Sequence, residues 1–190
     1  MKTNNFKLKI VFIILVLFWF TECDFKKRTL LIRNHKTIER ISIGMDINSA
    51  KNRLDRKYYV EQREIPLFDK SPAYEYVVYK SDTKEVALLS FNSGYDGNSK
   101  DEVFRIVIKN PRYKTEEGVS VGMSIKELKQ KTKIKSADFN YTDGLFLISD
   151  VFDGGFLIDI SGVDFSTFNF ENIEVNAIPE ELKVKQIIIF

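Results

Sequence analysis

The hydrophobic and polar positions follow the same order in two parts of the chain. Residues 41–51 read ISIGMDINSAK and residues 119–129 read VSVGMSIKELK, so an apolar–polar–apolar triplet precedes Gly-Met in both. Asp46 and Ser124, which follow the Gly-Met pairs, are residues that commonly cap helix N-termini, and Glu127 completes a capping box with Ser124. Apolar residues then recur at helical spacing. Each stretch therefore predicts a short strand, a tight turn and a short amphipathic helix.

Apolar runs that predict β-strands follow each of these helices. They are rich in Val, Ile, Phe and Tyr, and turns containing Gly, Asp, Asn or Pro separate them. The expected strands cover residues 74–79, 86–91, 103–108, 137–141, 145–149, 156–160 and 184–190. The predicted fold class is α+β: two tandem repeats, each a strand and short helix followed by an antiparallel β-meander, with the helices packed on one face of the sheet. We expect residues 38–110 to form the first repeat and residues 111–190 the second.

The N-terminus has the layout of an export signal. Three lysines within the first nine residues precede eleven uninterrupted apolar residues, 10–20, which are too few to span a bilayer comfortably. Cys23, the single cysteine of the chain, follows shortly afterwards and resembles the lipobox cysteine of bacterial lipoproteins, which carries acyl chains. The resemblance implies a signal peptide in residues 1–22, a membrane anchor at lipidated Cys23 and a flexible tether in residues 23–37. The alternatives are an uncleaved anchor, or a cleaved signal with an incidental cysteine.

Charge is unevenly distributed along the chain. The formal net charge is +2, and residues 24–190 hold equal numbers of acidic and basic side chains, which argues against a nucleic-acid partner. Residues 136–190, however, contain ten acids against two lysines, and Phe is frequent among them. We expect this stretch to bind a protein partner around Asp150, Phe152, Asp153 and Phe156. The alternative is that the Phe side chains fill the core while the acids face solvent.

The segment around the second Gly-Met pair resembles a known motif. It carries the pattern Tyr113-x-Thr115-x-x-Gly118-x-x-Val121-Gly122-Met123 before a short helix. This pattern resembles one in poorly characterised Gram-negative envelope lipoproteins. The helix-then-meander order is similar in outline to the BamE/SmpA-type outer-membrane assembly lipoproteins and to the tandem β-lactamase inhibitor protein fold. The resemblance covers residues 111–128 and, more faintly, 41–54. It implies a non-enzymatic envelope protein that binds other proteins through its sheet, although no inhibitor-specific residues carry over.

The sequence predicts no catalytic residue, cofactor or metal site. The one histidine, His35, falls in the expected tether, where we expect nothing to orient it as a base. One histidine and one cysteine cannot supply a zinc site, and the oxygen-rich residues 96–102 lack the spacing of an EF-hand loop. Sequence spacing alone cannot identify a carboxylate pair for glycoside hydrolysis, because that pair is defined by its separation in space.

These observations favour a non-enzymatic, lipid-anchored protein of the cell envelope. It would face the periplasm or the cell surface and bind an envelope protein through its sheet or its acidic aromatic face. Two further hypotheses remain. A small periplasmic ligand-binding protein or carboxylate-dependent hydrolase requires a concave pocket with at least two convergent carboxylates. A structural spacer requires no defined site.

Overall fold

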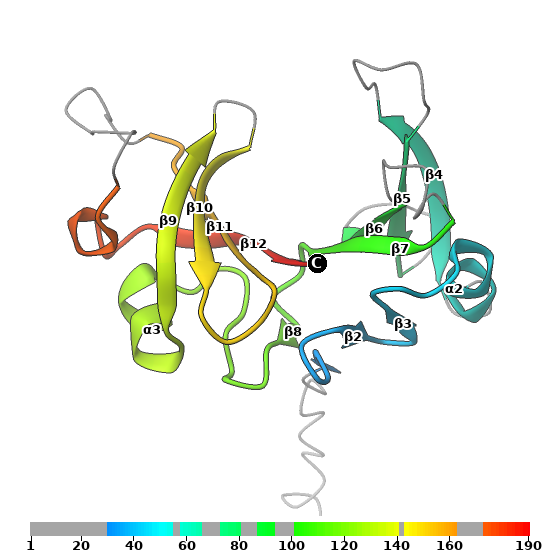
Figure 1. Cartoon of the computed structure of the whole chain (residues 1–190), viewed down its shortest axis with the longest axis horizontal. Helices are drawn as coiled ribbons and strands as arrows, with labels where there is room; N and C mark the ends of the chain where they lie inside the picture. Colours follow the sequence, from blue (N-terminus) through cyan, green and yellow to red (C-terminus); the bar gives the residue numbers. More distant parts are fainter. Residues whose placement is uncertain are drawn as a thin grey trace, which may run out of the picture.

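The fold is built on one eight-stranded antiparallel sheet (Figure 1). The computed structural model describes residues 30–54, 58–65, 73–80, 87–93, 101–140, 143–162 and 173–190. The strands of the sheet are β4 (Tyr59–Ile65), β5 (Ala73–Tyr79), β6 (Ala87–Ser93), β7 (Val103–Ile108), β9 (Ile134–Asn140), β10 (Gly144–Ser149), β11 (Gly154–Asp159) and β12 (Lys183–Ile189). Across the sheet they follow the order β4-β5-β6-β7-β12-β11-β10-β9.

Two meanders, β4–β7 and β9–β12, meet at the centre of this sheet. Their last strands, β7 and β12, pair with each other in antiparallel register, with Val107 opposite Ile188. Both strands are continuous runs of β-branched residues along this contact, and Ile106, Ile108 and Ile187 are fully buried. Such residues pack well on both faces of a pleated strand, which suits the central position.

Smaller elements complete the described part of the chain. They are β1 (Leu30–Leu31), β2 (Thr37–Ile38), β3 (Ile41–Ser42), α2 (Ile47–Leu54), β8 (Tyr113–Lys114), α3 (Ile125–Lys131) and the 3₁₀ helix η1 (Val175–Ala177). The capping box predicted for α3 is confirmed: the Glu127 N–H donates to Ser124 Oγ at 3.3 Å, and the Ser124 N–H donates to Glu127 Oε2 at 2.9 Å. Asp46 caps α2 by accepting from the Ser49 N–H at 2.7 Å. No helix in this part of the chain is long and apolar enough to cross a membrane.

Both α-helices pack against the same face of the sheet. The buried side of α2 (Ile47, Ala50 and Leu54) and that of α3 (Ile125 and Leu128) share one hydrophobic core with the strands. Figure 1 shows both helices on the lower side of the sheet, α2 near β4 and α3 near β9. We call the opposite side of the sheet the open face, because neither helix contributes to the apolar cluster that lies there.

The predicted fold class is wrong. About half of the described residues lie in strands, the main strands form one continuous antiparallel sheet, and α2 and α3 have only 8 and 7 residues. The fold is β-rich, and it is not an α+β fold of tandem helix–strand repeats. The strands expected before the helices do not join the main sheet: β2 and β3 form a separate two-stranded sheet, and residues 119–121 form no strand. The apolar residues Ile41 and Val119 of these triplets are buried, which accounts for the alternating pattern. An alternating pattern of burial does not determine which backbone groups pair, so it does not place a segment in a particular sheet.

Each Gly-Met pair joins the start of a helix to a strand through backbone hydrogen bonds. The Gly122 N–H donates to Val184 O at 2.8 Å, and the Val184 N–H donates to Met123 O at 2.8 Å. The Gly44 N–H donates to Val103 O at 2.9 Å in the same way. Gly44 and Gly122 have φ of 76° and 87°, a region that glycine enters without steric cost. The two glycines therefore shape turns that fix the helices to the sheet.

Residues 30–37, which were expected to belong to a flexible tether, are part of the fold. β1 pairs in parallel with β8, Ile32 is buried, and the Ile32 N–H donates to Lys114 O at 2.9 Å. The fully buried Tyr113 donates its hydroxyl hydrogen to Glu39 Oε1 at 3.1 Å. The segment looks like a linker in sequence because its partners lie about 80 residues further along the chain. The predicted signal peptide and Cys23 lie outside the described residues, so lipidation remains a prediction.

Candidate functional site

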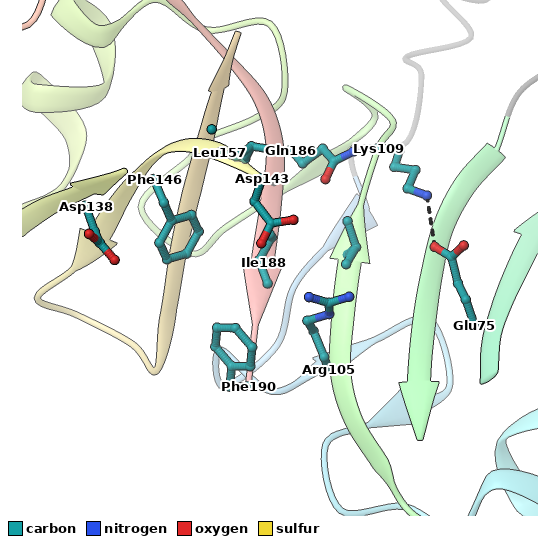
Figure 2. Close-up of a pocket in the computed structure, with 12 residues that line it drawn as sticks. Glu75, Arg105, Lys109, Asp138, Asp143, Phe146, Leu157, Gln186, Ile188 and Phe190 are labelled. Atoms are coloured by element: carbon teal, nitrogen blue, oxygen red, sulfur yellow. Dashed lines mark hydrogen bonds and ion pairs between the residues drawn. The ribbon is translucent and has the colours of Figure 1, made fainter. Parts of the chain in front are cut away.

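A groove of about 360 Å³ lies on the open face, where the two meanders meet (Figure 2). Its volume falls within the range of roughly 300–1,000 Å³ that is usual for ligand pockets. The groove is formed by side chains from both meanders and by the end of the chain. The lining residues are Glu75, Arg105, Val107, Lys109, Asp138, Asp143, Gly144, Phe146, Leu157, Gln186, Ile188 and Phe190.

The first wall of the groove comes from β7, from Lys109 just after it, and from Glu75 of β5. Because side chains alternate along a strand, Arg105 and Lys109 face the same side as Val107. Lys109 Nζ lies 3.2 Å from Glu75 Oε1. Burial opposes ionisation of Glu75, but the Ser90 hydroxyl and the Lys109 ammonium outweigh it and hold the pKa of Glu75 below its ordinary value of 4.5. Glu75 is therefore ionised at neutral pH and neutralises Lys109.

Arg105 keeps most of its hydrogen-bonding capacity for the groove. Its Nε donates to Asn92 Oδ1 at 3.4 Å, and no ion pair of Arg105 is present among the described residues. Figure 2 shows the guanidinium directed toward the centre of the groove, near Phe190 and Asp143. Asn92 is only 1% exposed and its Nδ2 has no hydrogen-bond partner. The buried Asn92 amide therefore orients the Arg105 guanidinium through Nε, and the terminal nitrogens point into the groove.

The floor of the groove is apolar. Val107, Leu157 and Ile188 form a buried cluster on the open face, and Phe146 and Phe190 pack against it. We call these five residues the apolar floor. The cluster is separate from the main core on the helix-covered face. A ligand can therefore contact the apolar floor without disturbing the main core.

Gly155 determines how closely the strands under the apolar floor approach. A Cβ on Gly155 would lie 2.0 Å from the carbonyl oxygen of Leu147 and 3.0 Å from the ring of Phe146. No side chain fits in that space, so the position requires glycine. The missing side chain lets Phe146 lie directly over the β11 backbone.

The second wall of the groove is acidic. It contains Asp138 of β9 and Asp143, which immediately precedes β10. Asp138 is exposed, and its Oδ1 accepts from the Phe139 N–H at 2.9 Å. In Figure 2 the Asp143 carboxylate is directed into the groove. The groove therefore carries a guanidinium on one wall and two carboxylates on the other, above an apolar floor.

A second polar cluster surrounds His35. Its Nε2 lies 2.7 Å from Glu117 Oε1, and its ring stacks on Phe152 with centroids 5.6 Å apart. Burial opposes ionisation of Glu117, but hydrogen bonds from its own backbone, Thr115 and His35 outweigh it and lower its pKa. The expectation that nothing orients His35 was wrong. Its partner Glu117 is 82 residues away in the sequence, so the residues around His35 gave no sign of the contact.

Glu117 is the side chain that is hydrogen-bonded to His35 among the described residues. No hydroxyl or thiol group in this part of the chain is hydrogen-bonded to His35. The described residues also contain no group of three or more His, Cys, Asp or Glu side chains that could hold a metal ion. The His35–Glu117 pair joins the N-terminal segment to the segment before α3.

The predicted contact residues lie outside the groove. Asp150 and Asp153 are exposed in the turn between β10 and β11, at the opposite end of β10 from Asp143. Phe152 is half-buried and packs edge-on against Phe156, with centroids 5.7 Å apart. Phe156 is 0% exposed and belongs to the main core, so it presents no surface to a partner. A role for Asp150 and Asp153 in binding remains a prediction.

The residues that carry the sequence resemblance have structural roles. The Thr115 N–H donates to Val119 O at 2.9 Å, and the Val119 N–H donates to Thr115 Oγ1 at 3.1 Å. Gly118, between them, has φ of 82°. These contacts form the turn that leads into α3, so the motif by itself assigns no binding residue.

Sequence reasoning missed the residues of the groove. One signal was present in residues 103–109, VFRIVIK, where Arg105 and Lys109 interrupt an apolar run at alternate positions. Charges at such positions indicate that one face of a central strand is not fully covered by core. The acidic wall and Phe190 gave no comparable signal, because only the pairing of β7 with β12 brings them to the same place.

The fold and the groove define a β-rich protein whose main eight-stranded antiparallel sheet has helices on one face and a charged groove on the other. No protein-family model matches the chain, and no curated protein matches it. The chain is similar to a solved structure described as the uncharacterized protein yfeY from Escherichia coli. The TM-score is 0.58 at 11% sequence identity, and the match covers 84% of this chain and 97% of that chain. At this identity the similarity shows the fold alone.

Proposed function

We propose that the protein is a non-enzymatic, membrane-anchored protein of the cell envelope that binds another protein through the open face of its sheet. The observation that carries this proposal is the groove, with its apolar floor and charged walls. Protein interfaces commonly combine an apolar centre with a polar rim. The helix-covered face is already filled by the main core, which leaves the open face for a partner.

The predicted lipid anchor is compatible with this use of the sheet. Leu30, where the described fold begins, lies seven positions after Cys23. An extended chain of that length reaches roughly 25 Å at about 3.5 Å per residue. Acylation of Cys23 would therefore keep the sheet close to the membrane surface and raise the local concentration of any membrane-bound partner.

Fractionation of the full-length protein tests the anchor. We expect the wild-type protein to sediment with membranes and to gain mass from acyl chains, because multiple acylation holds a protein firmly in a bilayer. The variant Cys23→Ala should lose the acyl mass and leave the membrane fraction if its signal is still removed. Unmodified wild-type protein, measured by intact mass, contradicts lipidation but leaves the use of the open face untouched.

Site-specific photo-crosslinking tests the open face. A photoreactive amino acid replaces Asp138 in the groove, Asp150 in the predicted turn, or Lys126 on α3; all three positions are exposed. Crosslinking is carried out in the envelope of the native organism with the full-length chain. We expect one discrete adduct from position 138, its loss when Arg105→Ala is added, and no adduct from position 126. An adduct from position 150 alone moves the interface to the β10–β11 turn, and equal adducts from all positions refute a defined interface.

A second candidate function is the binding of a small molecule. The specific observation in its favour is that the groove is concave and contains the carboxylates of Glu75, Asp138 and Asp143. Glu75 is paired with Lys109 on the first wall, so the two carboxylates that share a wall are those of Asp138 and Asp143. This function predicts that position 138 gives no protein adduct, and that a native small molecule copurifies with the protein.

A further inference from the structure

The charged groups of the groove are arranged on two separate walls. Arg105 stands on β7, whereas Asp138 of β9 and Asp143, just before β10, stand on the other wall beyond the apolar floor. The Lys109–Glu75 pair is internally neutralised, so Arg105 is the cation that an incoming anion would meet. A ligand that complements this surface has an anionic group and a cationic group with apolar bulk between them.

We propose that the groove binds an extended peptide segment of the partner protein. A carboxylate of the segment lies on Arg105, a large apolar side chain packs on the apolar floor, and a basic side chain points toward Asp138. This inference rests on the proposed protein-binding function and specifies the chemistry of the partner. In an extended peptide, side chains on the same side are about 7 Å apart, so consecutive outward residues meet successive features of such a surface.

Arg105 is suited to recognise a carboxylate. A guanidinium presents a planar fork of N–H donors that pairs with both oxygens of a carboxylate, and lysine cannot reproduce this geometry. Asn92 Oδ1 accepts from Nε at 3.4 Å and holds the head group in orientation. The terminal nitrogens remain directed into the groove, as Figure 2 shows.

The apolar floor supplies the second point of contact. Phe146 and Phe190 are only partly buried, so their rings keep surface that an apolar side chain can cover. Beneath them, Val107 and Ile188 exclude water from the base of the groove. A peptide side chain of the size of Phe, Leu or Ile gains stability by covering these rings.

The test uses the full-length protein in mild detergent and a displayed library of random heptapeptides. We expect enrichment of peptides that carry Asp or Glu within two positions of Phe, Leu or Ile, with Lys or Arg on the other side of the apolar residue. The best peptide is then synthesised with a fluorescent label, together with a version in which its acidic residue is replaced by the amide. Binding is measured by fluorescence anisotropy.

Arg105→Gln should weaken binding of the acidic peptide about ten- to hundredfold, because a charge-assisted hydrogen bond is lost. In that variant the amide version of the peptide should bind no more weakly than the acidic one, since the two partners of one contact are not additive. Asp138→Asn should remove the preference for the basic residue. The control Arg63→Gln changes an exposed arginine of β4 that does not line the groove, and should leave affinity unchanged.

Three outcomes would overturn the inference. One is a library without the acidic–apolar pattern. Another is an equal loss of affinity in Arg63→Gln and Arg105→Gln. The third is binding of decanoate that depends on Arg105 in the absence of any enriched peptide, which would assign the groove to small carboxylates. If position 138 still crosslinks to a protein after any of these results, the proposed protein-binding function stands. Only the inference that the groove recognises an acidic–apolar–basic peptide is then refuted.

Discussion

Replacing Phe156 by Ala should destabilise the protein far more than replacing Phe152. Phe156 is 0% exposed, lies in the main core and contacts the edge of Phe152. Removal of a fully buried Phe typically costs about 3–5 kcal/mol, because the transfer free energy of the ring is lost and a cavity remains. Phe152 is half-buried, so Phe152→Ala should cost about 1–2 kcal/mol.

The free energy of unfolding is measured by urea denaturation of the full-length protein in mild detergent, followed by far-ultraviolet circular dichroism. For a chain of this size, a loss of 3–5 kcal/mol lowers the melting temperature by about 6–20 °C. Such a loss is a large share of the total stability of a single domain. A cost below about 1 kcal/mol for Phe156→Ala, or a larger cost for Phe152→Ala, would show that Phe156 is not a core residue. Phe156 would then return to the candidate partner surface.

Two further predictions concern the groove. Gly155→Ala should lower the free energy of unfolding by at least about 2 kcal/mol, because the new Cβ meets the Leu147 carbonyl oxygen and the backbone must shift. In the control Gly162→Ala the new Cβ meets open space, and only the φ of 81° is unfavourable, so the free energy of unfolding should fall by about 1 kcal/mol. Equal losses for the two variants would refute the argument from the Leu147 contact. The pKa of Glu75 lies below 4.5 in the folded protein, so its contribution is present above that pH and is lost as pH falls through the lower folded value. Between pH 5 and pH 3, the urea midpoint of Glu75→Gln should therefore fall less steeply than that of the wild type, and parallel curves contradict this assignment.

The groove depends on the junction of the two meanders. Arg105 belongs to the first meander, and Asp138, Leu157 and Ile188 belong to the second. The antiparallel contact between β7 and β12 places them around one opening. Changes that weaken this contact should therefore reduce binding without any direct change to the lining side chains.

Local features of this chain were predictable from sequence because they arise from neighbouring residues. Ser124 and Glu127 satisfy the first backbone amides of α3 within a single turn, and no distant residue is needed for that. Gly44 and Gly122 were expected at tight turns before the helices, and both have positive φ. The runs of β-branched residues in β7 and β12 indicated strands for the same reason, since their preference is local.

Only the tertiary structure decided which backbone groups pair and which side chains reach the surface. The sequence left open whether Phe156 contacts a partner or fills the core. The face that β11 turns to the core depends on the strands with which it pairs. His35 is hydrogen-bonded to Glu117, and Ile32 to Lys114 of β8, across about 80 residues of chain. The order of the eight strands assigned Arg105 and Asp138 to one groove. These are long-range contacts, whose formation depends on the packing of the whole sheet, and a local sequence pattern carries no record of them.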